Sequence, residues 1–390
     1  SIGYANGGWD KELTGIWVAK FEAGYSSGNN TATVKASSVN YTQMTAWVPA
    51  KEAGTTEDST QAARNWLDGT YSVLTGKNNN NVPLYEWKNG QQTAIKYPTF
   101  QPKTYSMNYI NVNDAYNISK VLTEEGNIYG LNNSTTDSHL IKNSEWGAVA
   151  YLAQSKYGND GTEPYVNNIT LNSGNRQRTD DMAGRTGIDS VYAVTGVTTG
   201  STSAGGIETT IDKINGTTGN TVNGGVYTWS QETGQKSSST LNMYGVFDMS
   251  GGVWERSAGY VANETWNLNG YGSSFTKSKI STKYSTVYPH DNTKDNNSIT
   301  SNDANIDTAS NANYPLNNYI FGDAIRETST SGTGLTNWNS DYSYFPALGT
   351  PFTIRGVYSW DGSTAGLFSF HRTGGASSYI HGFRSVLIAL

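Results

Sequence analysis

The amino-acid sequence predicts an α+β protein with two helices, short strands and long loops. Only 15% of the 390 residues are charged, while Asn, Ser, Thr, Gly and Tyr are abundant. This composition is more typical of a loop-rich β protein than of a helical bundle. Two segments nevertheless carry the apolar periodicity and flanking residues of helices, and apolar, strand-like segments stand near both ends of the chain.

Composition and charge exclude several classes of protein and site. The formal net charge is -6, and Lys and Arg form no basic stripe, which argues against a nucleic-acid binder that follows phosphates. Without cysteine the chain has no disulfide, thiolate metal site or cysteine nucleophile. No apolar run approaches the roughly 20 residues of a membrane span. The first residue is Ser1 rather than Met, which is compatible with removal of a leader or anchor.

The N-terminal part begins with a predicted strand. In Gly15–Ala23, Ile16 and Val18 alternate with Trp17 and Ala19, so apolar side chains point to both faces. The polar segment Ser26–Ala46 favours β-structure. We also expect a short helix at Ser59–Leu67.

Two helices are predicted more firmly, each between a capping residue and a glycine. The first covers about Val112–Glu125, with Asn111 as the N-cap and Gly126 after its end. The second covers about Ser144–Tyr157, with Asn143 as the N-cap and Gly158 as the stop. Its apolar stripe contains Trp146, Val149, Ala150 and Ala153.

Two long segments lack periodicity and are predicted to be loop insertions. They cover about residues 159–240 and 263–338 and are rich in Gly, Thr, Asn and Ser. Loops of this length in a compact domain are usually functional or decorate a scaffold. Between them, Asn242–Tyr260 reads as a turn-rich element with a core tryptophan.

The C-terminal segment Ile354–Leu390 combines aromatic residues with Ser and Gly and closes in an apolar strand, Phe383–Leu390. Tyr, Trp, His and Arg give large contact areas, and Ser and Gly give adaptable hydrogen bonds, as in recognition surfaces. The alternative is a Gly-rich loop that crosses the edge of a core. Composition does not decide between the two.

Four motifs in order resemble the formylglycine-generating enzyme (sulfatase-modifying factor) family, and they span nearly the whole chain. They are the strand GIWVAKFEA at Gly15–Ala23, the helix HLIKNSEWGAVAYLA at His139–Ala153, the signature YGVFDMSGGVWE at Tyr244–Glu255, and Arg355-Gly356 followed by Gly382-Phe383-Arg384.

The resemblance implies a single C-type-lectin-like domain over residues 1–390, with short antiparallel strands and a first strand that pairs with the last. Structural roles are expected for the motif residues Glu145, Trp146, Asp248, Trp254, Glu255, Arg355, Gly382, Phe383 and Arg384.

The chain also departs from the family. Gly252 stands in place of the family's asparagine, Arg256 in place of a tryptophan, and Val357 in place of the second glycine of Arg-Gly-Gly. The oxidase branch of the family uses a pair of cysteines that bind copper, and this chain has no cysteine. That chemistry is therefore excluded, and we expect no enzyme activity.

The sequence looks closest to the variable proteins of this fold that retroelements diversify, which include phage receptor-binding proteins and bacterial surface or pilin-like adhesins. Asn318–Gly334 and Phe383–Leu387 also resemble such proteins. In that branch the binding face lies between Arg-Gly and Gly-Phe-Arg, here residues 354–382. The expected ligand contacts are Tyr358, Trp360, Asp361, Phe368, Phe370, Arg372, Ser378, Tyr379 and His381.

The implied setting is extracellular, on a bacterial surface, pilus or phage particle. A host-surface protein or glycan is the expected ligand, and the chain is expected to form a homo-oligomer or join a pilus or phage tail. Two other functions stay open. One is a structural subunit of a pilus or phage tail, and the other is an enzyme derived from the family.

Alternative roles also stay open for several polar residues. His371 and His381 could converge on a metal, although no carboxylate cluster accompanies them. Asp361 could bind a structural calcium ion, although the further ligands of such a site are not visible, so no cofactor is expected. Asp248 and Glu255 could work as paired acids, but we favour structural roles in a turn and with a buried donor.

Overall fold

The computed structural model describes residue 13 and residues 15–24, 71–72, 77–78, 85–88, 91–94, 98–103, 106–107, 110–125, 127, 129–171, 193–209, 225–261, 271–272, 276, 281–288, 320–347, 349–376, 378 and 380–390. The predicted β-leaning segment Ser26–Ala46 and helix Ser59–Leu67 lie outside these residues.

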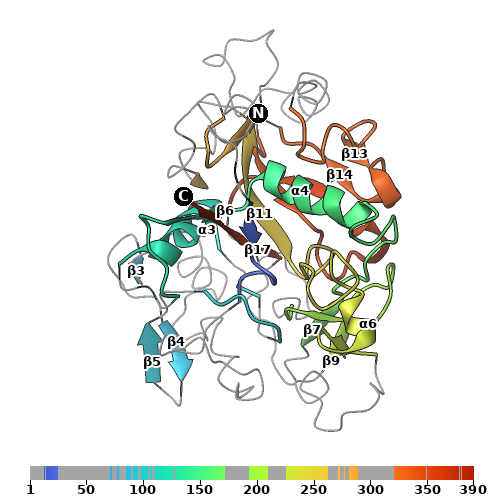
Figure 1. Cartoon of the computed structure of the whole chain (residues 1–390), viewed down its shortest axis with the longest axis horizontal. Helices are drawn as coiled ribbons and strands as arrows, with labels where there is room; N and C mark the ends of the chain where they lie inside the picture. Colours follow the sequence, from blue (N-terminus) through green and yellow to red (C-terminus); the bar gives the residue numbers. More distant parts are fainter. Residues whose placement is uncertain are drawn as a thin grey trace, which may run out of the picture.

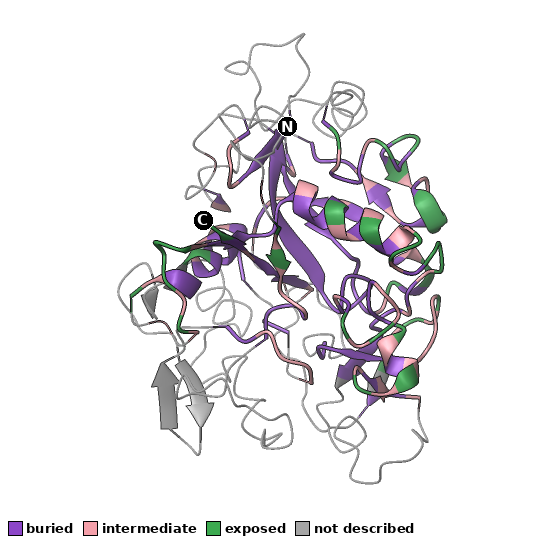
Figure 2. Cartoon of the chain, viewed as in Figure 1, coloured by how far each residue is buried: buried purple, intermediate pink, exposed green. Residues whose placement is uncertain are grey.

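The protein has an α+β fold, as the sequence predicts (Figure 1). The largest sheet among the described residues has seven strands. Along the sheet the order is β12-β11-β15-β16-β14-β13, and β17 also pairs with β11. The bounds are β11 (Trp254–Val261), β12 (Thr286–Tyr288), β13 (Thr333–Gly334), β14 (Ser343–Tyr344), β15 (Phe352–Arg355), β16 (Phe370–Thr373) and β17 (His381–Phe383). Every residue of β11 is buried, which places this strand at the centre of the molecule (Figure 2).

A three-stranded sheet joins the two ends of the chain. Its order is β1 (Trp17–Val18), β18 (Ser385–Ala389) and β6 (Thr136–Leu140), with β18 in the middle. Trp17 pairs with Leu387 and Val18 with Val386 in antiparallel register. The predicted pairing of the first and last strands is confirmed, although β1 is shorter than the apolar pattern suggested.

Smaller elements complete the described structure. Four two-stranded sheets pair β2 (Tyr71–Ser72) with β3 (Lys77–Asn78), β4 (Tyr85–Lys88) with β5 (Gln91–Ala94), β7 (Ile169–Leu171) with β9 (Ile207–Thr209), and β8 (Val197–Thr198) with β10 (Tyr227–Thr228). The short helical elements are α6 (Glu232–Gln235) and the 3₁₀ turns η3 (Val121–Thr123), η5 (Trp338–Ser340) and η6 (Gly362–Thr364).

These elements correct the view that residues 159–240 and 263–338 are loop insertions. Strands β7 to β10 lie in the first range, and β12 and β13 lie in the second. Since β12 and β13 belong to the seven-stranded sheet, part of the second range is scaffold. Strands of two or three residues are too short to show periodicity, which is why the sequence did not reveal them.

The first predicted helix is α3 (Val112–Lys120), which packs on β6. The side chain of Asn111 accepts a hydrogen bond from the backbone N–H of Asp114 at 2.8 Å, so the predicted N-cap is confirmed. The helix ends earlier than expected and tightens into η3.

The second predicted helix is α4 (Asn143–Gln154), and its predicted cap is wrong. Lys142 is the N-cap, and Glu145 accepts its backbone N–H at 2.9 Å. Asn143 lies inside the helix, where its amide donates to Tyr288 at 2.8 Å and Thr353 at 3.0 Å. Asn143 therefore makes buried hydrogen bonds to distant residues instead of capping the helix.

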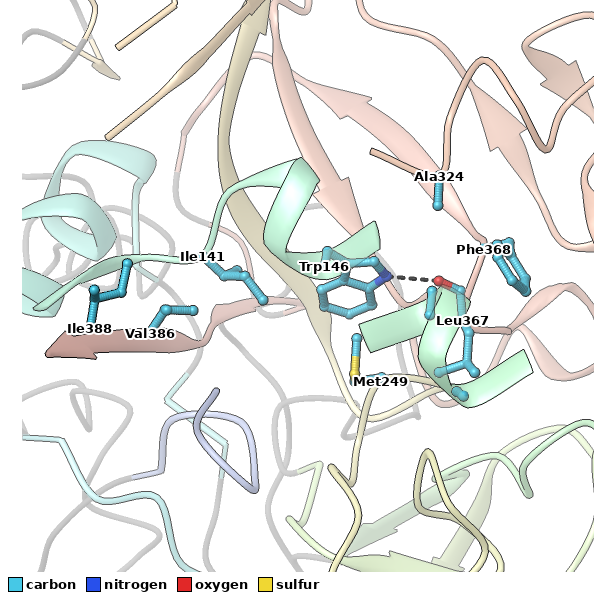
Figure 3. Close-up of a cluster of buried hydrophobic side chains, with 10 residues drawn as sticks. Ile141, Trp146, Met249, Ala324, Leu367, Phe368, Val386 and Ile388 are labelled. Atoms are coloured by element: carbon cyan, nitrogen blue, oxygen red, sulfur yellow. Dashed lines mark hydrogen bonds between the residues drawn. The ribbon is translucent and has the colours of Figure 1, made fainter. Parts of the chain in front are cut away.

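The core beneath α4 is built around Trp146 (Figure 3). Its ring packs among buried side chains from α4, β18 and the segment before β16, and its Nε1–H donates to the carbonyl of Leu367 at 2.7 Å. Trp254 is also buried, so both predicted core tryptophans are confirmed. Among the described residues, no helix is long and apolar enough to cross a membrane.

Candidate ligand-binding surface

The predicted binding segment, residues 354–382, runs through the middle of the seven-stranded sheet. Strands β15 and β16 pair in antiparallel register, with Ile354 opposite His371 and Arg355 opposite Phe370. Strand β17 then returns to pair with β11. Much of the segment is therefore scaffold rather than a surface loop.

Burial corrects the expected exposure of several predicted contact residues. Phe368 lies in the core around Trp146, and Phe370 lies in a second core cluster with Tyr288 and Phe345. Tyr358 is only 6% exposed. The expectation that these three aromatic side chains face solvent is wrong, because each of them packs into a cluster of buried side chains.

His381 is buried as well. Its Nδ1 lies 3.2 Å from Nη2 of Arg256, and burial lowers its pKa well below the ordinary value, so the ring is neutral. Arg372 is also buried, at 8% exposure. Of the remaining predicted contacts, Trp360 and Ser378 are half-buried and Asp361 is exposed. Tyr379 lies outside the described residues.

Three half-buried rings form a cluster near the predicted contacts. Two of them are Tyr344 of β14 and Tyr342, which directly precedes this strand. Tyr342 and Tyr344 alternate with buried Ser343 and Phe345, so both tyrosines emerge on one face of the sheet. His371 of β16 stacks on Tyr342 at 5.5 Å between ring centres and meets Tyr344 edge-on at 5.1 Å. Aromatic pairs in these arrangements stabilise each other's position.

The hydrogen bonding of His371 fixes its protonation. Nδ1 lies 2.6 Å from the carbonyl of Arg372, and a carbonyl only accepts, so Nδ1 carries the proton. Burial lowers the pKa of His371, and the charge of Arg372 lowers it further, while this hydrogen bond opposes the shift. The ring is therefore neutral at pH 7.

Arg372 lies against Tyr344 and is held there twice. Its guanidinium is 3.9 Å from the ring centre, and Nη2 donates to the tyrosine hydroxyl at 2.6 Å. Burial raises the pKa of Tyr342, and the charges of Tyr344 and Asp361 raise it further, while Arg372 lowers it. Asp361 and Arg372 thus place one charge of each sign beside Tyr342.

Trp360 is positioned by a loop from a distant part of the chain. A Cβ atom at Gly206 would overlap the indole ring of Trp360, and a Cβ atom at Gly362 would lie 3.3 Å from the Cα atom of Gly205. The indole therefore lies directly on the backbone of this loop, where only glycine fits. We call Tyr342, Tyr344, Trp360, Asp361, His371 and Arg372 the outer patch.

Two of the predicted motif residues, Arg355 and Arg384, make buried hydrogen bonds. The guanidinium of Arg355 donates to the backbone carbonyls of Ser369, Asp323 and Ala324 at 2.9, 2.9 and 3.2 Å. The guanidinium of Arg384 binds Glu255 through two hydrogen bonds of 2.9 and 2.6 Å. These contacts confirm the predicted roles for both arginines as buried partners of carbonyls or carboxylates.

The other motif acid, Asp248, satisfies turn amides as predicted. Its Oδ1 accepts from the backbone of Gly196 and the side chain of Asn167, both at 2.8 Å. Burial raises the pKa of Asp248 to about 6 and that of Glu255 to about 7.

A third buried acid, Glu22, joins this group and was missed in the sequence. One of its oxygens accepts from Ser106 and the other from the backbone N–H of Val253 at 3.2 Å. A Cβ atom at Gly252, whose φ is +74°, would approach Glu22 to 2.8 Å. The Glu22 carboxyl occupies the space that a side chain at Gly252 would need, which accounts for glycine at this position.

The described residues contain no group of three or more His, Asp or Glu side chains arranged to hold a metal ion.

Comparisons with known proteins add no relative. A scan against protein-family models found no match, and neither did a search of curated proteins.

Proposed function

We propose that this chain is a non-catalytic ligand-binding protein with a C-type-lectin-like domain, and that the outer patch holds its partner. The observation that carries the proposal is a group of partly exposed Tyr, Trp and His side chains, with the buried Arg372 against one of them, held in place by the sheet and its loops. Such residues dominate the binding energy of protein interfaces when they are pre-positioned.

The buried neighbours of the outer patch support this role. Tyr342 and Tyr344 alternate with the buried residues Ser343 and Phe345, and His371 stands between the buried residues Phe370 and Arg372 on β16. These side chains therefore lose little conformational freedom when a partner binds, which lowers the cost of association. The connection between β15 and η6 adds Trp360 and Asp361.

The motif resemblance supplies the biological side of the proposal. It favours a variable protein diversified by a retroelement, displayed on a bacterial surface, pilus or phage particle, that binds a host-surface protein or glycan. The chain also has no cysteine for the oxidase chemistry of the related enzymes.

A binding screen tests the proposal. Labelled protein is applied to arrays of glycans and of cell-surface proteins, beside a Tyr342→Ala/Trp360→Ala variant and the control Tyr244→Ala. Tyr244 is 86% exposed and lies outside the outer patch. We expect the wild type and the control to bind the same targets and the double variant to lose them. Equal binding by all three proteins would contradict the proposed site.

A further inference from the structure

His139 has two acidic partners, one on each ring nitrogen. The side chain is fully buried on β6. Nδ1 lies 2.8 Å from Oδ1 of Asp137, and Nε2 lies 2.9 Å from Oε1 of Glu145. Asp137 shares the strand with His139, whereas Glu145 belongs to the first turn of α4.

Each carboxyl group has further donors that favour its ionised form. The hydroxyl of Tyr284 donates to Oδ2 of Asp137 at 2.6 Å, and Nζ of Lys283 lies 3.5 Å from the same oxygen. The backbone N–H of Lys142 donates to Oε2 of Glu145 at 2.9 Å.

An ionised carboxylate can only accept hydrogen bonds. With two such partners, both ring nitrogens of His139 must donate, and an imidazole that donates from both nitrogens carries a positive charge.

Other charged and titratable groups surround this site on each packed element. The ammonium of Lys142, at the start of α4, lies 3.9 Å from Oε1 of Glu145. From α3, Lys120 and Tyr116 approach, and Lys120 lies 5.0 Å from the ring centre of Tyr284. From β11, Tyr260 acts electrostatically on Tyr116. On β18, the residue paired with His139 is the apolar Val386.

We infer that His139 is a protonated imidazolium at neutral pH that joins β6 to α4, and that loss of its proton at alkaline pH weakens this junction. Removal of the proton leaves one nitrogen lone pair directed at a carboxylate oxygen inside the core. Burial by itself lowers the pKa of His139, but Glu145 and Asp137 more than offset it and raise the pKa above the ordinary value.

The junction lies outside the outer patch, so this inference does not depend on the proposed function. It ties the sheet that contains the chain's last strand to the helix that carries Trp146. A change in the protonation of His139 would therefore loosen the scaffold rather than the binding residues.

Nitrogen-15 NMR of the histidine rings tests the inference directly. The chain has four histidines, so selective labelling gives few signals. At pH 7.5 we expect His139 to show two protonated ring nitrogens, and His371 and His381 to show one each. The His139 signals are assigned by elimination with His371→Gln and by contacts to the Tyr284 ring, 5.8 Å away. A non-protonated nitrogen in His139 at this pH would overturn the inference.

Two variants test the charge of His139 separately from its packing. In Asp137→Asn one acceptor loses its charge, so the His139 ring should lose its second proton at a lower pH than in the wild type. In His139→Gln the melting temperature should fall less steeply between pH 7 and pH 10 than in the wild type. An unchanged titration in the first variant, or equal slopes in the second, would contradict the inference. If His139→Gln does not fold, the titration of Asp137→Asn decides.

Discussion

At the scale of single residues, buried charges in this protein are held by dedicated partners rather than by solvent. Arg384 is the cation beside Glu22, Asp248 and Glu255, and all four side chains are buried. Removing one member of a buried ion pair usually costs about 3–5 kcal/mol, because the other charge stays behind without compensation.

Replacement of Arg384 by methionine should therefore lower the free energy of unfolding by about 3–5 kcal/mol. Urea unfolding measures this loss. The control is Lys156→Met, which removes an exposed cation at the end of α4 and should change stability by less than about 0.5 kcal/mol. Equal stability of the two variants would show that the Arg384–Glu255 pair is dispensable.

The position of Trp360 depends on a glycine. Gly206→Ala should displace the indole and destabilise the protein by about 1–3 kcal/mol, because the added Cβ atom overlaps the ring. The matched control is Gly205→Ala, whose Cβ atom would approach nothing closer than 3.9 Å. Thermal unfolding and tryptophan fluorescence compare the two. If Gly206→Ala behaves like its neighbour, the contact does not position Trp360.

For single residues, the sequence pattern could not predict whether a side chain faces solvent or the core. The alternation around Phe368 and Phe370 predicts which side chains share a face, but not whether that face meets solvent. Tyr342 and Tyr344 were missed for a related reason. The run Asp341–Phe345 shows no strand by itself, and only the pairing of β14 with β16 shows which of its side chains are buried. Whether a face is buried depends on which strands and helices lie against it, and the sequence pattern does not predict those neighbours.

At the scale of elements, the last strand holds the two ends of the chain together. β18 pairs with β1 on one side and with β6 on the other, and Val386 and Ile388 contribute to the main core. The apolar run Phe383–Leu390 and the motif resemblance were enough to predict this pairing. The N-cap of α4 was not predictable, because Asn143 serves distant residues, Tyr288 and Thr353.

Deletion of residues 383–390 should abolish soluble folding. It removes the central strand of the three-stranded sheet and exposes the edges of both neighbours. Circular dichroism and a melting curve of the truncated protein provide the measurement, with deletion of Leu390 alone as the control, since that side chain is 53% exposed. A truncated protein that melts like the wild type would refute the role assigned to β18.

At the scale of the whole molecule, the buried acids make stability depend on pH. Burial raises the pKa of Asp248 to about 6, that of Glu255 to about 7 and that of Asp323 to about 7. A carboxyl whose pKa is raised by folding stabilises the folded state below its unfolded pKa, and this contribution is lost as the pH rises through the folded value.

The melting temperature should therefore fall between pH 5 and pH 8, and His139, whose pKa is also raised, adds to the fall at the upper end. The pKa values of Asp137 and Glu145 are lowered, chiefly because His139 outweighs the effect of burial, so stability should also decline at strongly acidic pH. Differential scanning calorimetry across this range provides the test. A melting temperature that rises steadily from pH 5 to pH 8 would contradict these protonation states.

In this protein the aromatic rings that support the fold are distinct from those proposed to bind a partner. Once the screen yields a partner, its affinity and the unfolding free energy are measured on Tyr342→Ala and on Phe370→Ala. Tyr342→Ala should lose about 2 kcal/mol or more of binding energy and about 1 kcal/mol or less of stability. Phe370→Ala should lose about 3–5 kcal/mol of stability. Full affinity in a folded Tyr342→Ala protein would contradict the account.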